Sequence, residues 1–238
     1  MDVAVLSEII KETDKNWRFI FESPLYDKLT FIPGQLVQVH AHVPGFDKPV
    51  VRNYSVASWP DGTNKFELIV TYLNGGAMSE YLFNYIEPGD EILYKGPMGI
   101  FTLPDNLMDR DIYFVSTGSG ISPFRSMINH LYENKVPFKN IKLFFGTRTQ
   151  KDIVYREELE KINKELDNFE YIPTLSREKN SGLKEGYVHD HYIKLIDESP
   201  TKPLVYYCGW NIMIEEGRRL LKERGFEMMK DIRVEIFG

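Results

Sequence analysis

Short apolar segments, several of them alternating with polar residues, fill the first half of the chain. Turn-forming pairs such as Pro33-Gly34 and Pro44-Gly45 separate them. Short segments rich in β-branched and aromatic residues at this regular spacing are typical of a small antiparallel barrel. The pattern predicts strands over residues 3–6, 17–21, 36–41, 53–57 and 65–70, and one helix over residues 79–85.

The second half has a different pattern, in which apolar strands alternate with amphipathic helices. Such alternation is typical of βαβ units and of a parallel sheet covered by helices on both faces. We therefore expect two domains, an antiparallel β-barrel over residues 1–105 and an α/β domain over residues 106–238. The α/β domain is predicted to have strands at 112–116, 141–145, 169–174, 204–208 and 232–237, and helices at 123–134, 154–166, 187–196 and 211–224.

The stretch 112–131 predicts a strand, a glycine turn and a helix. Gly118 and Gly120 form the turn, while Ser122 and Pro123 suit the N-cap and the first position of the helix. Backbone N–H groups at such a helix start bind anions, most often phosphate. The two glycines match only part of the usual dinucleotide motif, so a tight turn without a ligand is the alternative.

Two constellations in the first half also indicate a ligand. Arg52 and Tyr54 point to the same face of a predicted strand, where a guanidinium and an aromatic ring suit a phosphate and a flat ring. Gly75-Gly76 leads into the helix predicted to begin at Ser79, which gives a second helix-start anion site. The structural alternatives are an exposed arginine and an ordinary β-to-α turn. Together the two constellations suit a pyrophosphate-bridged cofactor with a flat ring.

Composition narrows the class of function. The 238 residues carry a net charge of −6, which argues against nucleic acid or an anionic membrane surface as the main partner. The single cysteine, Cys208, excludes a disulfide within the chain and a four-cysteine iron–sulfur cluster. The histidines show no zinc-ligand spacing, so we expect no metal. No signal peptide and no membrane-length apolar run is visible, and we expect a soluble cytoplasmic protein.

Five short motifs follow one another along the chain: Pro33-Gly34-Gln35, Arg52-x-Tyr54-Ser55, Gly76-x-x-Ser79, Gly96-Pro97-x-Gly99-x-Phe101 and Thr117-Gly118-x-Gly120-Ile121-x-Pro123. Their order resembles the ferredoxin–NADP(+) reductase superfamily, and the resemblance covers essentially the whole chain. It implies an FAD-binding barrel followed by an α/β domain that binds a nicotinamide dinucleotide.

The resemblance also implies which residues hold FAD. Tyr54 is expected to stack on the isoalloxazine ring, and Arg52 to hold the pyrophosphate. Ser55 is expected to hydrogen-bond near flavin N5. The pyrophosphate is further expected to receive backbone and hydroxyl donors from Met78 and Ser79. The remaining cofactor-binding residues expected in the barrel are Val70 and Gly76.

A second set is expected to place the nicotinamide. Cys208 opens a Cys-Gly-x-x-x-Met pattern with Gly209 and Met213. The resemblance puts its thiol against the nicotinamide, as a positioning group and not a covalent nucleophile. Near the C-terminus, Phe237 is expected to cover the flavin, and Glu235 to place a carboxylate near the flavin and Cys208. A glycine after the aromatic residue departs from the plant-type pattern, and a plain edge strand is the alternative. The expected catalytic set is Ser55, Cys208, Glu235 and Phe237.

Loops at the ends of the predicted parallel strands carry the other candidates. Ser176 and Arg177 place a hydroxyl beside a guanidinium, which suits a 2′-phosphate. Arg148 suits either a ribose or phosphate contact or a solvated loop charge. The second strand does not end in an acidic residue for a ribose 2′-hydroxyl, the usual NAD solution. We therefore expect NADP, with NAD as the alternative because residues 186–189 resemble NAD-using relatives. The dinucleotide set is Thr117, Gly118, Gly120, Pro123, Arg148, Ser176, Arg177, Cys208, Gly209 and Met213.

The expected activity is hydride transfer between NADPH, or NADH, and FAD, followed by single-electron transfer to or from a separate carrier. The carrier is expected to be separate, because one cysteine cannot hold an iron–sulfur cluster in this chain. A ferredoxin or flavodoxin-like protein is expected because the Ser-Arg-Glu, Tyr-x-Glu-Glu and Val-Glu-x-Phe segments resemble ferredoxin reductases. Two enzymatic alternatives are a flavin reductase and the reductase component of an oxygenase. The non-enzymatic alternative is an accessory electron-transfer subunit that binds FAD.

Overall fold

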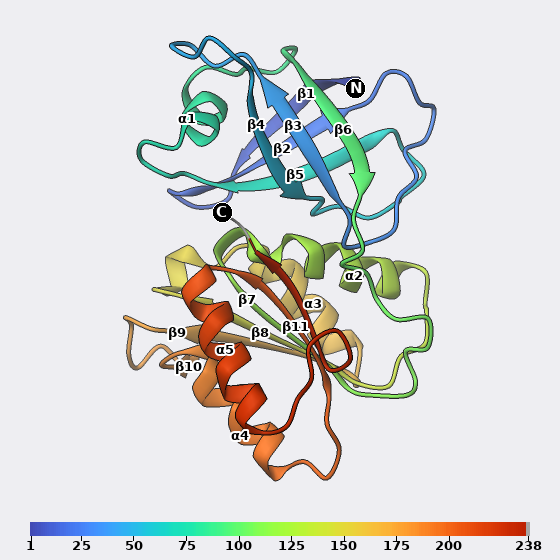
Figure 1. The fold of residues 1–238 in the computed structure, drawn as a ribbon, viewed down its shortest axis with the longest axis vertical. Coiled ribbons are helices and arrows are strands. Elements are labelled where there is room, and N and C mark those ends of the chain that lie inside the picture. The colour runs from blue at the N-terminus through green and yellow to red at the C-terminus, as the bar shows by residue number, and fades with distance from the viewer. Residues whose placement is uncertain (237–238) are drawn as a thin grey trace. The chain divides into compact units, whose positions relative to one another are not determined.

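The computed structural model describes residues 1–236, and the chain divides into two compact units. The first unit holds Met1–Thr102 together with Ser122–His130, and the second holds Leu103–Ile121 and the residues from Leu131 onward. Each unit is built around a six-stranded sheet (Figure 1). The expected domain boundary between residues 105 and 106 stays a prediction.

The sheet of the first unit is antiparallel, with strand order β4-β3-β6-β1-β2-β5. The two edge strands, β4 and β5, approach each other. The N–H of Ala57, just beyond β4, donates to the Glu67 carbonyl of β5 at 2.8 Å. The predicted antiparallel barrel architecture is thus confirmed. The strands are β1 (Asp2–Lys11), β2 (Asn16–Glu22), β3 (Leu36–Ala41), β4 (Val50–Ser55), β5 (Lys65–Thr71) and β6 (Glu91–Met98).

Strand β6 was not predicted, although it lies between β1 and β3 in the sheet. The sequence analysis treated Gly96-Pro97 as a turn. In the structure these two residues lie where the register between β3 and β6 shifts, between the Leu36–Met98 and Gln38–Lys95 pairs. Turn-forming residues therefore make an irregularity inside a strand here, which is a common use of glycine and proline in sheets.

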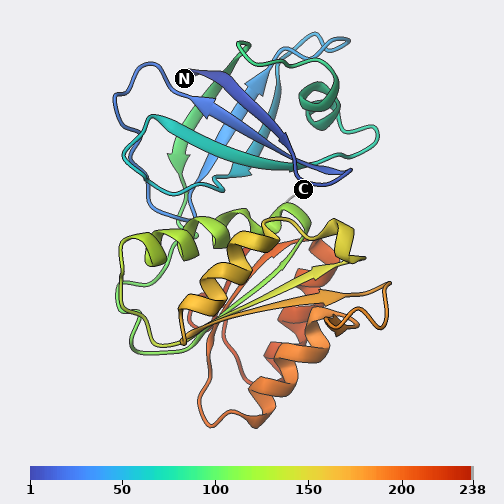
Figure 2. The same ribbon diagram turned by 180° about the vertical axis from the view of Figure 1, so that it is seen from behind.

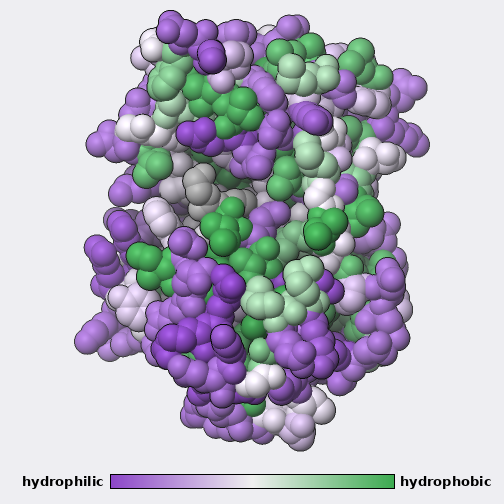
Figure 3. All heavy atoms as spheres, in the orientation of Figure 1, coloured by the Kyte–Doolittle hydropathy of each residue, from purple (hydrophilic) through white to green (hydrophobic). Residues whose placement is uncertain are grey.

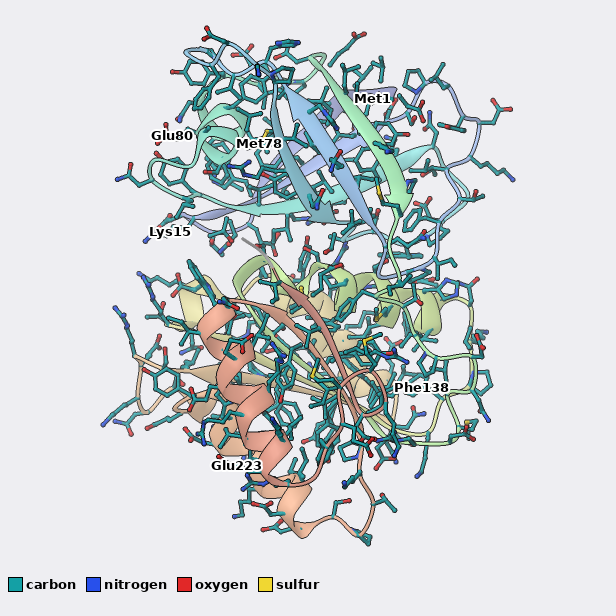
Figure 4. The ribbon with its side chains drawn as sticks, viewed as in Figure 1. Met1, Lys15, Met78, Glu80, Phe138 and Glu223 are labelled. Atoms are coloured by element: carbon teal, nitrogen blue, oxygen red, sulfur yellow. The ribbon has the colours of Figure 1, made fainter. Side chains whose placement is uncertain are left out.

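Helix α1 (Ala77–Asn84) packs on the barrel through Met78 and Leu82, both of which are buried. Figure 4 shows Met78 and Glu80 on different sides of this helix. The helix begins two residues before the expected Ser79, and Gly76 occupies its N-cap position. Ser79 is therefore a residue of the first turn, and the prediction that it caps the helix was wrong.

The sheet of the second unit is parallel throughout, with strand order β10-β9-β8-β7-β11-β12. The predicted α/β architecture is confirmed, and only the two-residue strand β10 was missed. The strands are β7 (Ile112–Thr117), β8 (Ile141–Thr147), β9 (Phe169–Leu175), β10 (Lys184–Glu185), β11 (Leu204–Gly209) and β12 (Ile232–Ile236).

The four α-helices of the second half begin and end within two residues of their expected positions. In the second unit, α3 lies on one face of the sheet and α4 and α5 lie on the other (Figures 1 and 2). Hydrophilic residues dominate the visible outer surface around α4 and α5 (Figure 3). The helices are α2 (Ser122–Glu133), α3 (Arg156–Glu165), α4 (Val188–Glu198) and α5 (Asn211–Glu223), with short 3₁₀ helices η1 (Gly118–Ile121) and η2 (Gln150–Asp152).

The strand order of the parallel sheet reverses at β7. From β7 the chain continues to β8, β9 and β10 on one side, and β11 and β12 return on the other. In open α/β sheets, ligands bind beyond the carboxyl ends of the strands at such a reversal. The topology therefore directs attention to the residues that follow β7 and β11.

The fold predicts that Gly34 is needed for its geometry. Its φ is +99°, and an added Cβ would lie 2.1 Å from the Phe101 carbonyl oxygen. We expect Gly34→Ala to lower the free energy of unfolding by about 3 kcal/mol or more, because a backbone clash adds to the left-handed strain. Urea unfolding of the purified protein measures this loss.

Gly45→Ala is the matched control. Gly45 also has a positive φ, +85°, but among the described residues no atom lies within 4 Å of its added Cβ. It should lose about 1 kcal/mol, the cost of the backbone strain alone. Equal losses in the two variants would contradict the steric argument.

Candidate functional site

An arginine and a tyrosine on β4 form one candidate ligand surface in the first unit. Arg52 is exposed, and Tyr54 is half-buried against the barrel core. Burial raises the pKa of the Tyr54 hydroxyl, and the positive charge of Arg52 opposes this effect, so the guanidinium lies near the ring. The phenol is neutral at physiological pH. A neutral aromatic plate beside a cation is the arrangement that the sequence predicted for this strand.

The other FAD candidates on the barrel strands lie deeper in the unit. Ser55, the last residue of β4, is buried at 2% exposure. Val70 belongs to the hydrophobic core, so its side chain packs inside the barrel. A cofactor contact by Val70 is therefore restricted to its backbone.

The start of α1 forms a tight turn. An added Cβ at Gly76 would lie 2.7 Å from Ser79 Oγ and 3.0 Å from the Leu73 carbonyl oxygen, so a larger residue does not fit. The Ser79 hydroxyl accepts from the Leu73 N–H at 3.2 Å and lies 2.9 Å from the Gly76 carbonyl oxygen. This hydroxyl is thus engaged within the loop. Helix geometry leaves the first-turn N–H groups, including that of Met78, without acceptors inside the helix.

In the second unit, the turn after β7 packs directly on the end of β11. An added Cβ at Gly120 would lie 2.3 Å from the Cys208 carbonyl oxygen. An added Cβ at Gly209 would lie 2.5 Å from Thr117 Oγ1, and this oxygen accepts from the Trp210 N–H at 3.1 Å. Glycine is therefore required on both sides of the contact. The structure brings together Thr117, Gly118, Gly120, Cys208 and Gly209, all of them predicted site residues.

The turn itself differs from the expected one. Residues 118–121 form the 3₁₀ helix η1, with Gly118 at φ +57°, and α2 follows without a break. Ser122 is consequently the first residue of α2 and Pro123 the second, so the prediction that Ser122 caps the helix was wrong. The helical turns therefore begin at Gly118, about one turn before the expected helix start at Pro123.

Cys208 is a buried neutral thiol. It is fully buried in β11, and the β-ladder register pairs it with Ser116 on one side and Glu235 on the other. Burial raises the pKa of the thiol well above its usual value, and the charge of Glu235 raises it further. A thiol in this state has the properties of a small packing group and not of a nucleophile. Met213 is a buried residue of α5, and Phe237 lies outside the described residues.

The loops after β8 and β9 are held together by hydrogen bonds. The Arg177 N–H donates to the Arg148 carbonyl at 2.9 Å, and Ser176 donates to the Thr147 carbonyl from its N–H and its hydroxyl. Both arginine side chains are exposed. Two exposed arginines thus lie on loops that are hydrogen-bonded to each other, an arrangement that suits an anion. The Ser176 hydroxyl already uses its proton, so it is available to a ligand as an acceptor.

The same pair of loops is braced by a carboxylate. Glu178 accepts from the Gln150 N–H at 2.8 Å and from its side-chain amide at 2.9 Å. These two bonds lower the pKa of the Glu178 carboxyl. The brace fixes the loop that carries Arg177.

A buried charge cluster that contacts Ala57, just beyond β4, was missed by the sequence analysis. Arg18 and Arg125 both donate to the carboxylate of Glu67, at distances from 2.7 to 3.1 Å. The partners of Glu67 lie 49 and 58 positions away along the chain. No local pattern marks such a cluster, because each residue alone has the signature of a solvated charge.

Two further observations limit what the chain holds. Across residues 1–236, no three histidine, cysteine, aspartate or glutamate side chains are grouped so as to bind a metal ion. In the same residues, the helices are too short or too polar to cross a membrane. The cytoplasmic location stays a prediction.

Two family models match the chain in succession. Residues 4–103 match the oxidoreductase FAD-binding domain, and residues 114–219 match the oxidoreductase NAD-binding domain. The chain is 37% identical over 198 residues to ferredoxin–NADP reductase B of Sorangium cellulosum, covering 81% of this chain and 79% of that protein. It is 28% identical over 231 residues to the glycine betaine monooxygenase reductase subunit of Pseudomonas aeruginosa, covering 94% of this chain but 61% of the relative.

Two solved structures illustrate the similarity of fold. A cytochrome P450 reductase of Amycolatopsis superimposes with a TM-score of 0.85 at 25% identity, covering 100% of this chain and 70% of that one. A ferredoxin NADP⁺ reductase of Neisseria gonorrhoeae with bound FAD and NADP superimposes with a TM-score of 0.80 at 21% identity, covering 98% and 97%.

The state of Cys208 predicts slow alkylation. Because its pKa is raised, the thiol stays protonated in the folded protein at pH 8–9, where an unfolded cysteine with a pKa of about 8.5 ionises. We expect iodoacetamide to label the native protein at least about a hundredfold more slowly than the urea-unfolded protein. Mass spectrometry measures both rates. Similar rates would show an accessible, reactive thiolate.

Proposed function

The chain belongs to the ferredoxin–NADP(+) reductase superfamily of FAD- and NAD-binding oxidoreductases, and we propose that it uses NADPH and FAD to serve a separate one-electron carrier. It is a flavoenzyme reductase with FAD and a nicotinamide dinucleotide as cofactors, as the order of its motifs predicted. FAD, when bound, supplies the redox chemistry, accepting two electrons as a hydride and releasing them singly. The protein supplies binding and orientation.

The first unit fits the FAD group. Tyr54 offers a neutral ring for stacking, and the exposed Arg52 offers a bidentate partner for pyrophosphate. The Met78 and Ser79 N–H groups, at the positive end of α1, would receive the same pyrophosphate. The Ser79 hydroxyl holds the loop in place, so we assign its contribution to the backbone. Ser55 would place its hydroxyl near flavin N5.

The observation that carries the nicotinamide site is the contact between η1 and β11. Gly120 lies against the Cys208 carbonyl with no room for a side chain. The absence of side chains at Gly118 and Gly120 would let the pyrophosphate approach the backbone at the strand-order reversal. The Cys208 thiol, neutral and immobile, would pack against the nicotinamide ring. Glu235, next to Cys208 in the ladder, would place its carboxylate there.

The two arginine loops favour NADPH over NADH. A 2′-phosphate is a dianion at neutral pH, and Arg148 and Arg177 would neutralise it from neighbouring loops. Ser176 would turn its hydroxyl from the Thr147 carbonyl and donate its proton to the same phosphate. We therefore propose NADPH as the physiological donor or product.

The carrier is proposed to be a ferredoxin or flavodoxin-like protein. These 238 residues have one cysteine and lack the ligands of a cysteine-ligated iron–sulfur cluster, so we assign such a cluster to a separate carrier. A role as the reductase component of an oxygenase is the second candidate, favoured by the similarity to the glycine betaine monooxygenase reductase subunit. The chain spans 61% of the length of that relative, so the carrier need not be the same.

Anaerobic stopped-flow reduction tests both the activity and the choice of nicotinamide. We expect NADPH to bleach the flavin of the FAD-loaded protein. In Arg177→Ala, the apparent dissociation constant for NADPH should rise about thirtyfold, since a charge-assisted hydrogen bond contributes about 2 kcal/mol. The constant for NADH should change by less than about twofold.

Lys179→Ala is the matched control for Arg177→Ala. Lys179 is an exposed cation two positions further along the same loop, and its loss should leave both constants near the wild-type values. Equal losses for NADPH and NADH in Arg177→Ala would contradict the 2′-phosphate assignment. A wild-type flavin that neither nicotinamide bleaches would contradict the proposed activity itself.

A further inference from the structure

The Glu67 carboxylate joins two arginines from different elements of the first unit. Arg18 of β2 donates from Nε and Nη2 to the two carboxylate oxygens at 3.0 and 2.7 Å. Arg125 of α2 donates from Nη1 to Oε1 at 3.1 Å. Arg18 also contacts Glu12 at 3.4 Å, which extends the cluster to a second carboxylate. Both Arg125 and Glu67 are buried.

The cluster holds the chain segment that leaves β4. The Ala57 carbonyl accepts from Arg125 Nη1 at 3.0 Å, while the Ala57 N–H donates to the Glu67 carbonyl at 2.8 Å. The Glu67 N–H in turn donates to Ser58 Oγ at 3.0 Å. Ala57 is thus fixed through both of its backbone polar groups. It lies two positions after Ser55, the residue assigned to the flavin.

Stability alone is a weak reason for this arrangement. Burying charged groups costs several kcal/mol per ion, and well-packed apolar residues often replace a buried ion pair without loss. The ion pairs do fix orientation, because a planar guanidinium holds the groups that accept its hydrogen bonds in a defined geometry. The Trp59 ring covers the Arg125 guanidinium, with 5.4 Å between Cζ and the ring centroid, and limits its movement further.

We propose that Arg125 and Glu67 are positioning residues that fix the place of Ser55 at the flavin by holding Ala57. The proposal rests on the proposed function, since it concerns the geometry of hydride transfer to the bound flavin. Transfer rates depend steeply on geometry, and a displacement of about 1 Å costs about a hundredfold. Loss of the Arg125 contact frees the Ala57 carbonyl and lets the Ser55 backbone shift.

A double-mutant cycle between Arg125 and Ser55 tests the proposal in the FAD-loaded full chain. We expect Arg125→Met to lower the limiting rate of flavin reduction by NADPH about ten- to hundredfold. Its dissociation constant for NADPH should stay within about twofold of wild type. Arg125→Lys, which keeps the charge, should recover part of the rate. In a Ser55→Ala background, Arg125→Met should change the rate by less than about twofold, because the positioned group is gone.

Arg110→Met is the matched control. Arg110, in the second unit, also joins a carboxylate to a backbone carbonyl, with Nη2 at 2.9 Å from Asp231 Oδ1 and at 2.8 Å from the Pro203 oxygen. Its loss should leave the limiting rate within about twofold of wild type in both backgrounds. A rate loss of equal size in Arg110→Met would show a general effect of destabilisation and overturn the assignment.

The visible circular dichroism of the bound flavin gives a readout that does not need turnover. We expect Arg125→Met and Glu67→Gln to change this spectrum, and Arg110→Met to leave it unchanged. An unchanged spectrum in Arg125→Met would overturn the positioning role. So would an Arg125→Met rate loss that is as large in the Ser55→Ala background as in the wild type. If NADPH and NADH both fail to bleach the wild type, the proposed function is wrong, and the spectrum still decides the positioning role. A wild type that binds no FAD would overturn both.

Discussion

The contact between Gly120 and the Cys208 carbonyl is the constraint on which the second unit depends. An added Cβ would lie 2.3 Å from that oxygen, so the turn after β7 and the end of β11 meet as bare backbone. Because the strand order reverses at this point, both strand ends open toward the same space. Gly209 repeats the requirement from the other side, where Thr117 Oγ1 ties the start of α5 to β7. The neutral thiol of Cys208 follows from the same close packing.

The first unit meets the need for anion binding in a related way. A glycine precedes α1, the Ser79 hydroxyl fastens the turn, and the Glu80 carboxylate accepts from the Gly75 N–H at 2.7 Å, so the helix start that we assign to the pyrophosphate is a fixed turn. The segment that follows β4 in this unit is held by a buried ion pair. Glu67 and Arg125 fix Ala57, and Ala57 fixes the end of the strand that carries Tyr54 and Ser55. In the proposed function, each unit would thus combine a glycine-flanked helix start for an anion with a held backbone segment for the reacting ring.

Local sequence patterns were sufficient to predict most of the secondary structure and the superfamily. Alternation and helical periodicity located most strands and all α-helices, and the motif order identified the superfamily. Strand β6 was missed because Gly96-Pro97 has the signature of a turn, whereas sheet pairing places it at an irregularity. Ser79 and Ser122 were assigned as caps, since the sequence does not show that each helix begins earlier. The Arg18–Glu67–Arg125 cluster depends on residues brought together only by the fold, and the lid assigned to Phe237 lies outside the described residues.

Hydrogen–deuterium exchange, measured first with FAD and then with NADP⁺ added as well, tests most directly whether the two units bind different cofactors. FAD alone should slow exchange at residues 76–79 and 52–57, because amides that bind a ligand open less often. NADP⁺ added to the FAD-loaded protein should slow exchange at residues 118–121 and 176–178. Protection of 118–121 by FAD, or unchanged exchange at both of the latter segments with NADP⁺, would contradict the account.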